Sequence, residues 1–338
     1  MSDTLAETTA AGGPAGSAAV ADGAIADGAI AVLTEPGADA PPAGPADGLP
    51  SGPSLSPSRA ADFMACPLLY RFRVVDRLPE PPGPATARGT LVHAVLERLF
   101  DEPRGSRTPE AARALLAPQW ERLVIAEPSL AELFAAEAQR LTWLDEAATM
   151  LDRYFTLEDP NRIEPSFREM SVQAMLESGL TLRGYIDRLD IAPTGELRIV
   201  DYKTGLAPRE EYEARALFQM KFYALVLWRT RGTIPRVLQL IYLGNGEIMR
   251  YAPSEADLLA TERKINALWQ AIDRASAAGD WRPRPSRLCE WCAFQDLCPA
   301  YGGTPPPLPV AGPEPGNGPA SQAGHPEVHV PAPRDDAV

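Results

Sequence analysis

Lysine and histidine are almost absent from this sequence. Of its 32 basic side chains, only three are lysine: Lys203, Lys221 and Lys264. A chain that otherwise uses arginine retains a lysine where a compact ammonium group with a tunable pKa is useful. Two of the three histidines lie near the C-terminal end, at positions 325 and 329, which leaves His93 as the sole histidine of the expected folded region. Lys203 and His93 are therefore candidate functional residues.

Three further absences restrict the class of protein. The first 58 residues contain no lysine or arginine, so the charged start of a secretory signal peptide is missing. No apolar run approaches the roughly 18 residues that a membrane-spanning helix needs. With only four cysteines, three of them close together between 289 and 298, a secreted disulfide framework is excluded too. We therefore expect a soluble, cytoplasmic protein with no membrane partner, in which thiols stay reduced.

Both ends of the chain have the composition of disordered tails. Residues 1–55 are mostly Ala, Gly, Pro and Asp, with seven acids and no base, and residues 301–338 are rich in proline. Such segments lack the apolar side chains that a core needs. The net charge of −13 divides into −7 and −3 for these tails and −3 for residues 56–300. We expect one folded domain at 56–300, whose charge does not exclude binding to nucleic acid.

A predicted hairpin carries the most informative residues. Two β-rich runs, at 180–191 and 196–202, are separated by the turn sequence Ala-Pro-Thr-Gly. Because side chains alternate along a strand, Asp201 and Lys203 point to one face, and Asp187 on the first strand can converge with them. Two carboxylates suit Mg²⁺ or Mn²⁺, and a lysine beside the ion can orient a water or offset charge on a phosphate. The hairpin therefore predicts a site for cutting phosphodiesters.

The rest of the domain alternates helical and strand patterns. Helices are predicted from Thr108 through 120, over 129–155 and 210–229, and from Ser254 to about 277; strands are predicted over 237–243 and 247–251. Gln219 and Tyr223, spaced i, i+4, share one helix face that we expect to look onto the metal site. These elements predict the α/β class, a mixed β-sheet flanked by helices, with a helical insertion after the helix that carries His93.

Four short motifs give a family resemblance. They are Gly89-x-x-x-His93, Gly184-x-x-Asp187, Asp201-Tyr202-Lys203 and Gln219-x-x-x-Tyr223. In this order they resemble the PD-(D/E)XK nuclease superfamily, and more narrowly its RecB-like exonuclease branch. The resemblance covers about 56–300 and implies a restriction-endonuclease-like fold and a metal-dependent DNA nuclease, most directly an exonuclease of DNA repair or recombination.

The resemblance also implies roles for single residues. The metal ligands for Mg²⁺ or Mn²⁺ are His93, Asp187 and Asp201. Lys203 positions the attacking water and stabilises the developing charge. Gln219 and Tyr223 help to hold the DNA strand; the alternative for these two is that they buttress the hairpin.

The four cysteines indicate a second metal site. They are Cys66, Cys289, Cys292 and Cys298. Their spacing alone fits a structural zinc ion or an iron–sulfur cluster. The resemblance favours a 4Fe-4S cluster, because iron–sulfur members of the branch place four cysteines around the nuclease motifs in this way. Such a cluster is expected to clasp the two ends of the domain together and close a long loop.

DNA, single-stranded or with a free end, is the expected partner. No G-x-x-x-x-G-K-[ST] pattern occurs in this sequence, so we expect any helicase to be a separate protein. Arginines flank the cysteines at 71, 73 and 77 and at 282, 284 and 287. Either they form a track for a single strand, with nearby aromatic residues available for base stacking, or the arginines solvate a surface and the aromatic residues pack around the cysteine site. These aromatic residues are Tyr70, Phe72, Trp281 and Trp291.

Two other functions fit parts of the pattern. The CRISPR-associated nuclease that trims new spacers belongs to the same branch and uses the same motifs and cysteines. A non-catalytic DNA-binding scaffold subunit would keep the fold, but we expect such a relative to lose Lys203 or a metal ligand. Here every one of these positions is present.

Overall fold

The computed structural model describes residues 52–208 and 213–309. The predicted tails at 1–55 and 301–338 lie mostly outside these ranges. Two residues of the first predicted tail, Ser54–Leu55, form strand β1, and Leu55 is buried. The sheet therefore begins slightly before the expected boundary of the folded domain. Within the described part of the chain, no helix is long and apolar enough to span a membrane.

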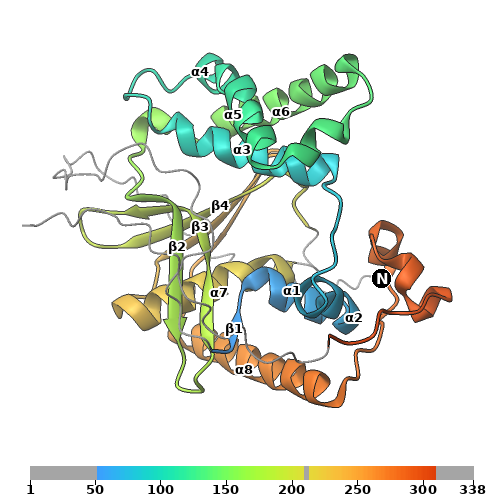
Figure 1. Ribbon diagram of the computed structural model, residues 1–338. Coiled ribbons are helices and arrows are strands. Elements are labelled where there is room, and N and C mark those ends of the chain that lie inside the picture. Colours follow the sequence, from blue (N-terminus) through green and yellow to red (C-terminus); the bar gives the residue numbers. More distant parts are fainter. Residues whose placement is uncertain (1–51, 209–212, 310–338) are drawn as a thin grey trace, which may run out of the picture.

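A six-stranded mixed sheet lies at the centre of the molecule (Figure 1). One edge of strand β3 pairs with β2. Its other edge pairs with β1 near the start of β3 and with β4 near its end. Strands β5 and β6 continue the sheet beyond β4; the β1–β3 and β4–β5 pairs are parallel and the rest antiparallel. The bounds are Phe167–Met175 for β2, Thr181–Ile191 for β3, Leu197–Lys203 for β4, Val237–Tyr242 for β5 and Glu247–Tyr251 for β6.

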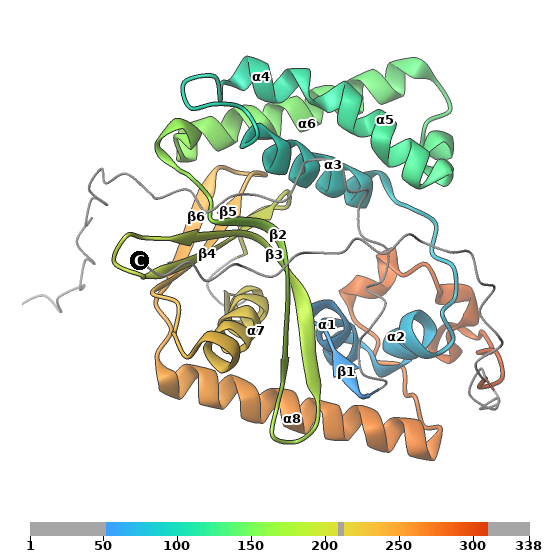
Figure 2. The ribbon, with the colours of Figure 1, turned by 60° about the vertical axis from the view of Figure 1, so that its left-hand side comes forward.

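Helices cover both faces of this sheet, as the sequence predicts (Figure 2). One face packs against α1 (Pro57–Ala65), α2 (Pro67–Tyr70), α7 (Glu213–Arg231) and α8 (Glu255–Ala278). The opposite face packs against α3 (Pro84–Leu99), which carries His93, and against the helical insertion that follows it. The insertion consists of α4 (Pro109–Ala114), α5 (Leu116–Ala126) and α6 (Glu137–Leu157). Each face has its own apolar core, and the mixed sheet with flanking helices confirms the predicted fold class.

The boundaries of several helices differ from the predicted ones. The predicted helix after Thr108 ends at α4, and α5 begins as a separate helix at Leu116. The helix predicted from 129 begins only at Glu137, after a 3₁₀ turn over Pro128–Leu133. Strand β2 was not predicted, because its sequence mixes Arg, Glu, Ser and Gln with apolar residues. The caps are as predicted: Thr108 and Ser254 each accept a hydrogen bond from the first helical turn.

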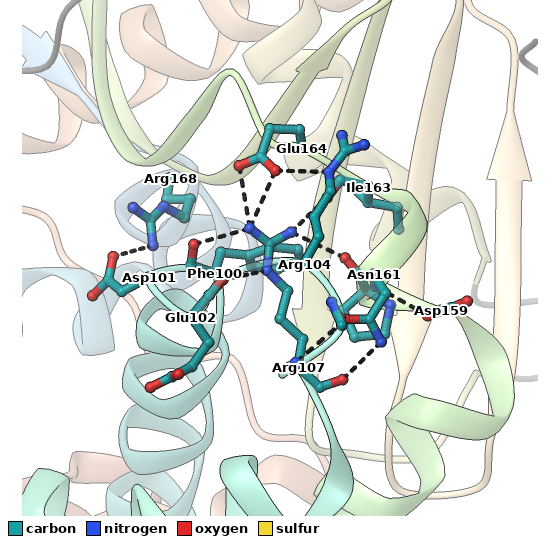
Figure 3. A network of polar contacts seen from close by, with 12 residues as sticks. Phe100, Asp101, Glu102, Arg104, Arg107, Asp159, Asn161, Ile163, Glu164 and Arg168 are labelled. Carbon is teal, nitrogen blue, oxygen red and sulfur yellow. Dashed lines mark hydrogen bonds and ion pairs between the residues drawn. The ribbon is translucent and has the colours of Figure 1, made fainter. Parts of the chain in front are cut away.

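A buried arginine closes the base of the helical insertion (Figure 3). Arg107 is 3% exposed and donates to backbone carbonyls on both sides of the insertion. On the α3 side it bonds to Phe100 and Glu102, and on the side that returns to the sheet it bonds to Pro160 and Ile163. The start and the end of the insertion are thus tied together, which fixes α3 over the sheet.

Candidate active site

The candidate site lies where strands β3 and β4 diverge. Their pairing runs from Ile191↔Leu197 to Arg188↔Val200 and then stops, while β4 stays paired with β5 as far as Lys203. On the same edge of β3, β1 pairs only at Thr181 and Leu182. Residues 183–187 of this edge therefore have no strand partner, and the fork opens toward helix α7.

Asp201, Lys203 and Gln219 form one half of the site. Asp201 is 2% exposed, and its Oδ2 lies 2.6 Å from Lys203 Nζ. Gln219, on α7, donates to Asp201 Oδ1 at 3.0 Å and accepts from Lys203 Nζ at 2.8 Å. The amide thus holds the carboxylate and the ammonium in a fixed relation.

Asp187 and His93 form the other half. Asp187 Oδ2 accepts a hydrogen bond from the Tyr202 backbone N–H at 2.8 Å, in place of the strand pairing that has ended. His93 on α3 brings Nδ1 to 3.4 Å from the same oxygen, and its Nε2 lies 2.8 Å from the Tyr202 carbonyl oxygen. The histidine that the sequence singled out therefore lies beside the first predicted carboxylate.

The glycine of the Gly-x-x-Asp motif makes room for the tyrosine of the Gln-x-x-x-Tyr motif. A Cβ on Gly184 would lie 2.7 Å from Tyr223 Cε1, well inside van der Waals contact. The Tyr223 hydroxyl accepts from Gln219 at 3.3 Å and forms a hydrogen bond with the Tyr185 backbone. Burial raises the pKa of Tyr223 to about 12, so its hydroxyl remains protonated. All six predicted site residues are therefore brought together.

Glu169, on strand β2, belongs to the same site, although the sequence did not single it out. Atoms of His93, Glu169 and Asp187 that could bind a metal all lie within 4.8 Å of one another. Glu169 falls opposite Asp187 in the β2–β3 register, and its φ of 43° is in the left-handed region, which is uncommon for any residue other than glycine. Backbone strain at such a position is typical of functional sites.

The strained backbone at Glu169 lies beside a change of face on β3. Ile186 and Leu189 of β3 both belong to the core beneath α7, although an uninterrupted strand would place them on opposite faces. Arg188, between them, is buried toward the helical insertion and bonds to the Tyr202 hydroxyl at 2.7 Å. The switch occurs at Asp187 and turns its carboxylate into the fork.

The electrostatics of the site favour a cation. Burial, together with the charge of Asp187, raises the pKa of Glu169 to about 8. Burial, and then the charge of Asp201, raises the pKa of Asp187 to about 6. Carboxylates that face one another in this way repel unless a positive charge lies between them.

The residues present fit a divalent metal ion. One imidazole and several carboxylate oxygens suit Mg²⁺ or Mn²⁺. Asp201 Oδ2 is buried and, among the described residues, forms no hydrogen bond of suitable geometry. The group of His93, Glu169 and Asp187 therefore forms a candidate metal site, and Asp201 is close enough for its charge to act on Asp187.

The four cysteines line one apolar cavity. Its volume is about 60 Å³, room for about four water-sized groups, and Leu68, Phe72 and Leu288 also contribute to its wall. Backbone N–H groups of Arg284 and Ser286 each donate to a cysteine sulfur at 3.3 Å. The Ser286 N–H, and then the Tyr301 hydroxyl, lower the pKa of the Cys289 thiol, whereas burial raises that of Cys292.

Most of the aromatic residues near the cysteines are packed in the interior and do not form an open track. Tyr70, Phe72 and Trp281 are all less than 7% exposed, and Tyr70 stacks on Trp281 within the core. Only Trp291, at 75%, is largely exposed. Arg71 pairs with Asp76, and Arg73 pairs with Asp62 and Glu80. Packing therefore holds for Tyr70, Phe72 and Trp281, of which Phe72 lines the cysteine cavity.

Comparison with known proteins identifies relatives in mycobacterial phages. The chain is 23% identical over 278 residues to the Gene 69 protein of Mycobacterium phage D29, across 74% of this chain and 97% of that protein. It is 29% identical over 126 residues to the Gene 69 protein of Mycobacterium phage L5, across 36% of this chain and 41% of that protein. The crystal structure of a candidate exonuclease from Eubacterium rectale is 13% identical, with a TM-score of 0.47, and the match covers 70% of this chain and 86% of that one.

The profile of one protein family matches most of the chain. The match runs over residues 54–299 and includes β1, the fork, α7 and the cysteine segments. The matched family is the PD-(D/E)XK nuclease superfamily, and this chain belongs to it.

Proposed function

We propose that this protein is a metal-dependent DNA nuclease of the RecB-like branch, acting as an exonuclease in DNA repair or recombination. The observation that carries the proposal is the fork between β3 and β4. There Asp187, Asp201 and Lys203 converge beside His93, with Lys203 Nζ 2.6 Å from Asp201. A fixed ammonium beside a group of carboxylates is suited to phosphodiester hydrolysis.

The chain's own residues divide the work. Asp187, Asp201, Glu169 and His93 would hold Mg²⁺ or Mn²⁺, and the bound ion would supply Lewis-acid stabilisation of the phosphate. Lys203 orients the attacking water and offsets negative charge that develops on the phosphate. Gln219 keeps Lys203 and Asp201 in place through two hydrogen bonds. Tyr223 stays protonated and can donate to a phosphate oxygen of the bound strand.

We further propose that the four cysteines hold a 4Fe-4S cluster. Zinc bound by thiolates at about 2.3 Å would draw the sulfurs to about 3.8 Å from one another. Among the described residues, no three cysteine sulfurs lie within 4.8 Å of one another. A cluster, which spaces its thiolates more widely than one ion does, suits these positions better. It would join Cys66, after α1, to the segment at 289–298.

Cleavage of end-labelled DNA tests the proposed activity. Anaerobically purified protein should degrade the DNA with Mg²⁺ or Mn²⁺ but not with EDTA, and Lys203→Ala should lose the activity. Lys264→Ala, a lysine on α8 that lies over the Phe218 ring, is the matched control and should keep it. Equal activity in both variants would contradict the assignment of Lys203. No cleavage by cluster-loaded wild-type protein would favour the scaffold function instead.

A further inference from the structure

The far half of the β2–β3 hairpin has a polar face that leads to the metal site. Ser171 and Gln173 on β2 lie opposite Tyr185 and Arg183 on β3. The alternate residues point into the core, namely Val172, Ala174, Leu182 and Ile186. Tyr185 is 52% exposed and stands two residues before Asp187, on the same face of the strand. The hairpin extends beyond the rest of the sheet (Figure 2) and reaches α8, where Ser178 bonds to Asn266.

This face lacks acidic residues in a chain that is otherwise acidic. Between Met170 and Ile186 the one carboxylate is Glu177, in the exposed turn at the tip of the hairpin. Beyond Glu169 and Asp187, the face is therefore neutral or positive along its whole length.

Arg183 lies on this face, Arg59 of α1 is close enough to feel its charge, and Arg77 is close to Arg59. Within the described part of the chain, the side chains of Arg59, Arg77 and Arg183 form no hydrogen bond and no ion pair. Burial lowers the pKa of Arg59, and the nearby positive charges of Arg183 and Arg77 lower it further. Neighbouring Arg73, by contrast, is paired with Asp62 and Glu80. Unpaired arginines that repel one another favour a polyanion as their partner.

We infer that a single strand of DNA follows this face to the metal site. This inference rests on the proposed function, in which DNA is the substrate. Tyr185 stacks on a base beside the cleaved phosphate, and Arg183, Arg59 and Arg77 contact phosphates farther out. At 3.3–3.4 Å per residue, Tyr185 and Arg183 are about 7 and 13 Å along β3 from Asp187. Stacking on a tyrosine requires an unpaired base, which selects a single strand over a duplex. We call these four residues the strand track.

Binding of a fluorescent oligothymidine tests the strand track. Each variant is built on Lys203→Ala, so that the DNA stays intact, and affinity is measured over a series of salt concentrations. The slope of log Kd against log salt reports the number of phosphate contacts, at about 0.7 per contact for single strands. Arg59→Gln with Arg183→Gln should reduce this slope by about 1.4. The matched control is Arg122→Gln with Arg263→Gln, two exposed arginines on α5 and α8, and it should keep the parent slope.

Tyrosine variants test the stacking step in the same assay. Tyr185→Ala should weaken binding about 5- to 150-fold, whereas Tyr185→Phe, which keeps the ring, should bind like the parent. Melting temperatures equal to that of the parent show that each variant is folded.

Two results would overturn the strand track. One is an unchanged salt slope in the Arg59 and Arg183 variant. The other is tighter binding to a blunt duplex than to oligothymidine. The proposed function is judged separately, by whether wild-type protein cleaves DNA. If wild type cleaves DNA and the Arg59 and Arg183 variant has an unchanged slope, the strand track is wrong but the proposed function stands. If wild type neither binds nor cleaves DNA, both are wrong.

Discussion

At the scale of single residues, the metal site is a place where like charges are held together. Asp187 and Glu169 face each other across β2 and β3, and Asp201 adds a third carboxylate near them. Direct opposition of like charges destabilises a sheet. Glu169 also has a left-handed backbone conformation. The folded protein thus contains both the repulsion between carboxylates and the strained backbone at Glu169. A cation bound between the carboxylates would remove the repulsion.

The raised pKa values predict how stability changes with pH in metal-free protein. The pKa of Glu169 rises from 4.5 to about 8, and that of Asp187 from 3.8 to about 6. Between the unfolded and folded values the native state holds more protons, so the free energy of unfolding falls as pH rises through this window. Between pH 5 and 8, Glu169→Gln should lose less thermal stability than wild type does.

Glu177→Gln, which changes an exposed carboxylate at the tip of the same hairpin, is the control for this measurement. It should follow the wild-type dependence on pH. If melting curves of Glu169→Gln and wild type fall in parallel over this range, Glu169 does not titrate as described.

At the scale of secondary-structure elements, much of the site was predictable from sequence. Alternation along a strand places Asp201 and Lys203 on one face, and the i, i+4 spacing places Gln219 and Tyr223 on one face of a helix. Both placements hold in the folded protein. Glu169 could not be found in this way. Its role depends on a left-handed residue within β2 and on a change of face at Asp187, and no periodic pattern encodes either of them. The closure of the aromatic residues around Trp281 likewise depends on contacts between distant segments.

A buried charge network connects the helical insertion to the strands of the site. Arg188 is 1% exposed and forms two hydrogen bonds, at 2.7 and 2.8 Å, with Glu158 at the end of α6. It also donates to the Tyr202 hydroxyl, between Asp201 and Lys203. This network supports the fork from the side opposite α7.

Removing one partner of this network should be costly. Arg188→Ala leaves the largely buried Glu158 with only longer contacts to Arg198 and Gln239. We expect a loss of about 3–5 kcal/mol in the free energy of unfolding. Arg113→Ala, which breaks an exposed pair with Asp152, should cost far less, because solvent screens the charges of an exposed pair. Urea denaturation of both variants measures the difference. Similar midpoints would mean that the buried network contributes little.

At the scale of the whole molecule, cysteines from the beginning and the end of the domain line one cavity. Cys66 precedes α2, and the other three cysteines follow α8, so the sheet and the insertion lie between them in sequence. The cavity that all four line is next to the core residues Leu68 and Phe72. A cluster there would act as a cross-link over more than 200 residues.

Loss of one cysteine ligand should therefore destabilise the whole domain. In the chain-entropy model, a cross-link over so long a loop contributes on the order of 4–5 kcal/mol. Cys66→Ser should lower the iron content and the visible absorbance of anaerobically purified protein, and should lower its melting temperature by several degrees. Stoichiometric zinc and no iron in the wild type would contradict the cluster and favour a structural zinc site.

In the proposed nuclease, the fork between β3 and β4 holds the divalent metal ion on which cleavage depends. Titration calorimetry with Mn²⁺ tests it most directly, using wild type, Asp187→Asn and, as a matched control, Asp152→Asn on the exposed face of α6. Wild type and Asp152→Asn should bind Mn²⁺, and Asp187→Asn should lose at least tenfold in Mn²⁺ affinity. Equal Mn²⁺ affinity in all three proteins would contradict it.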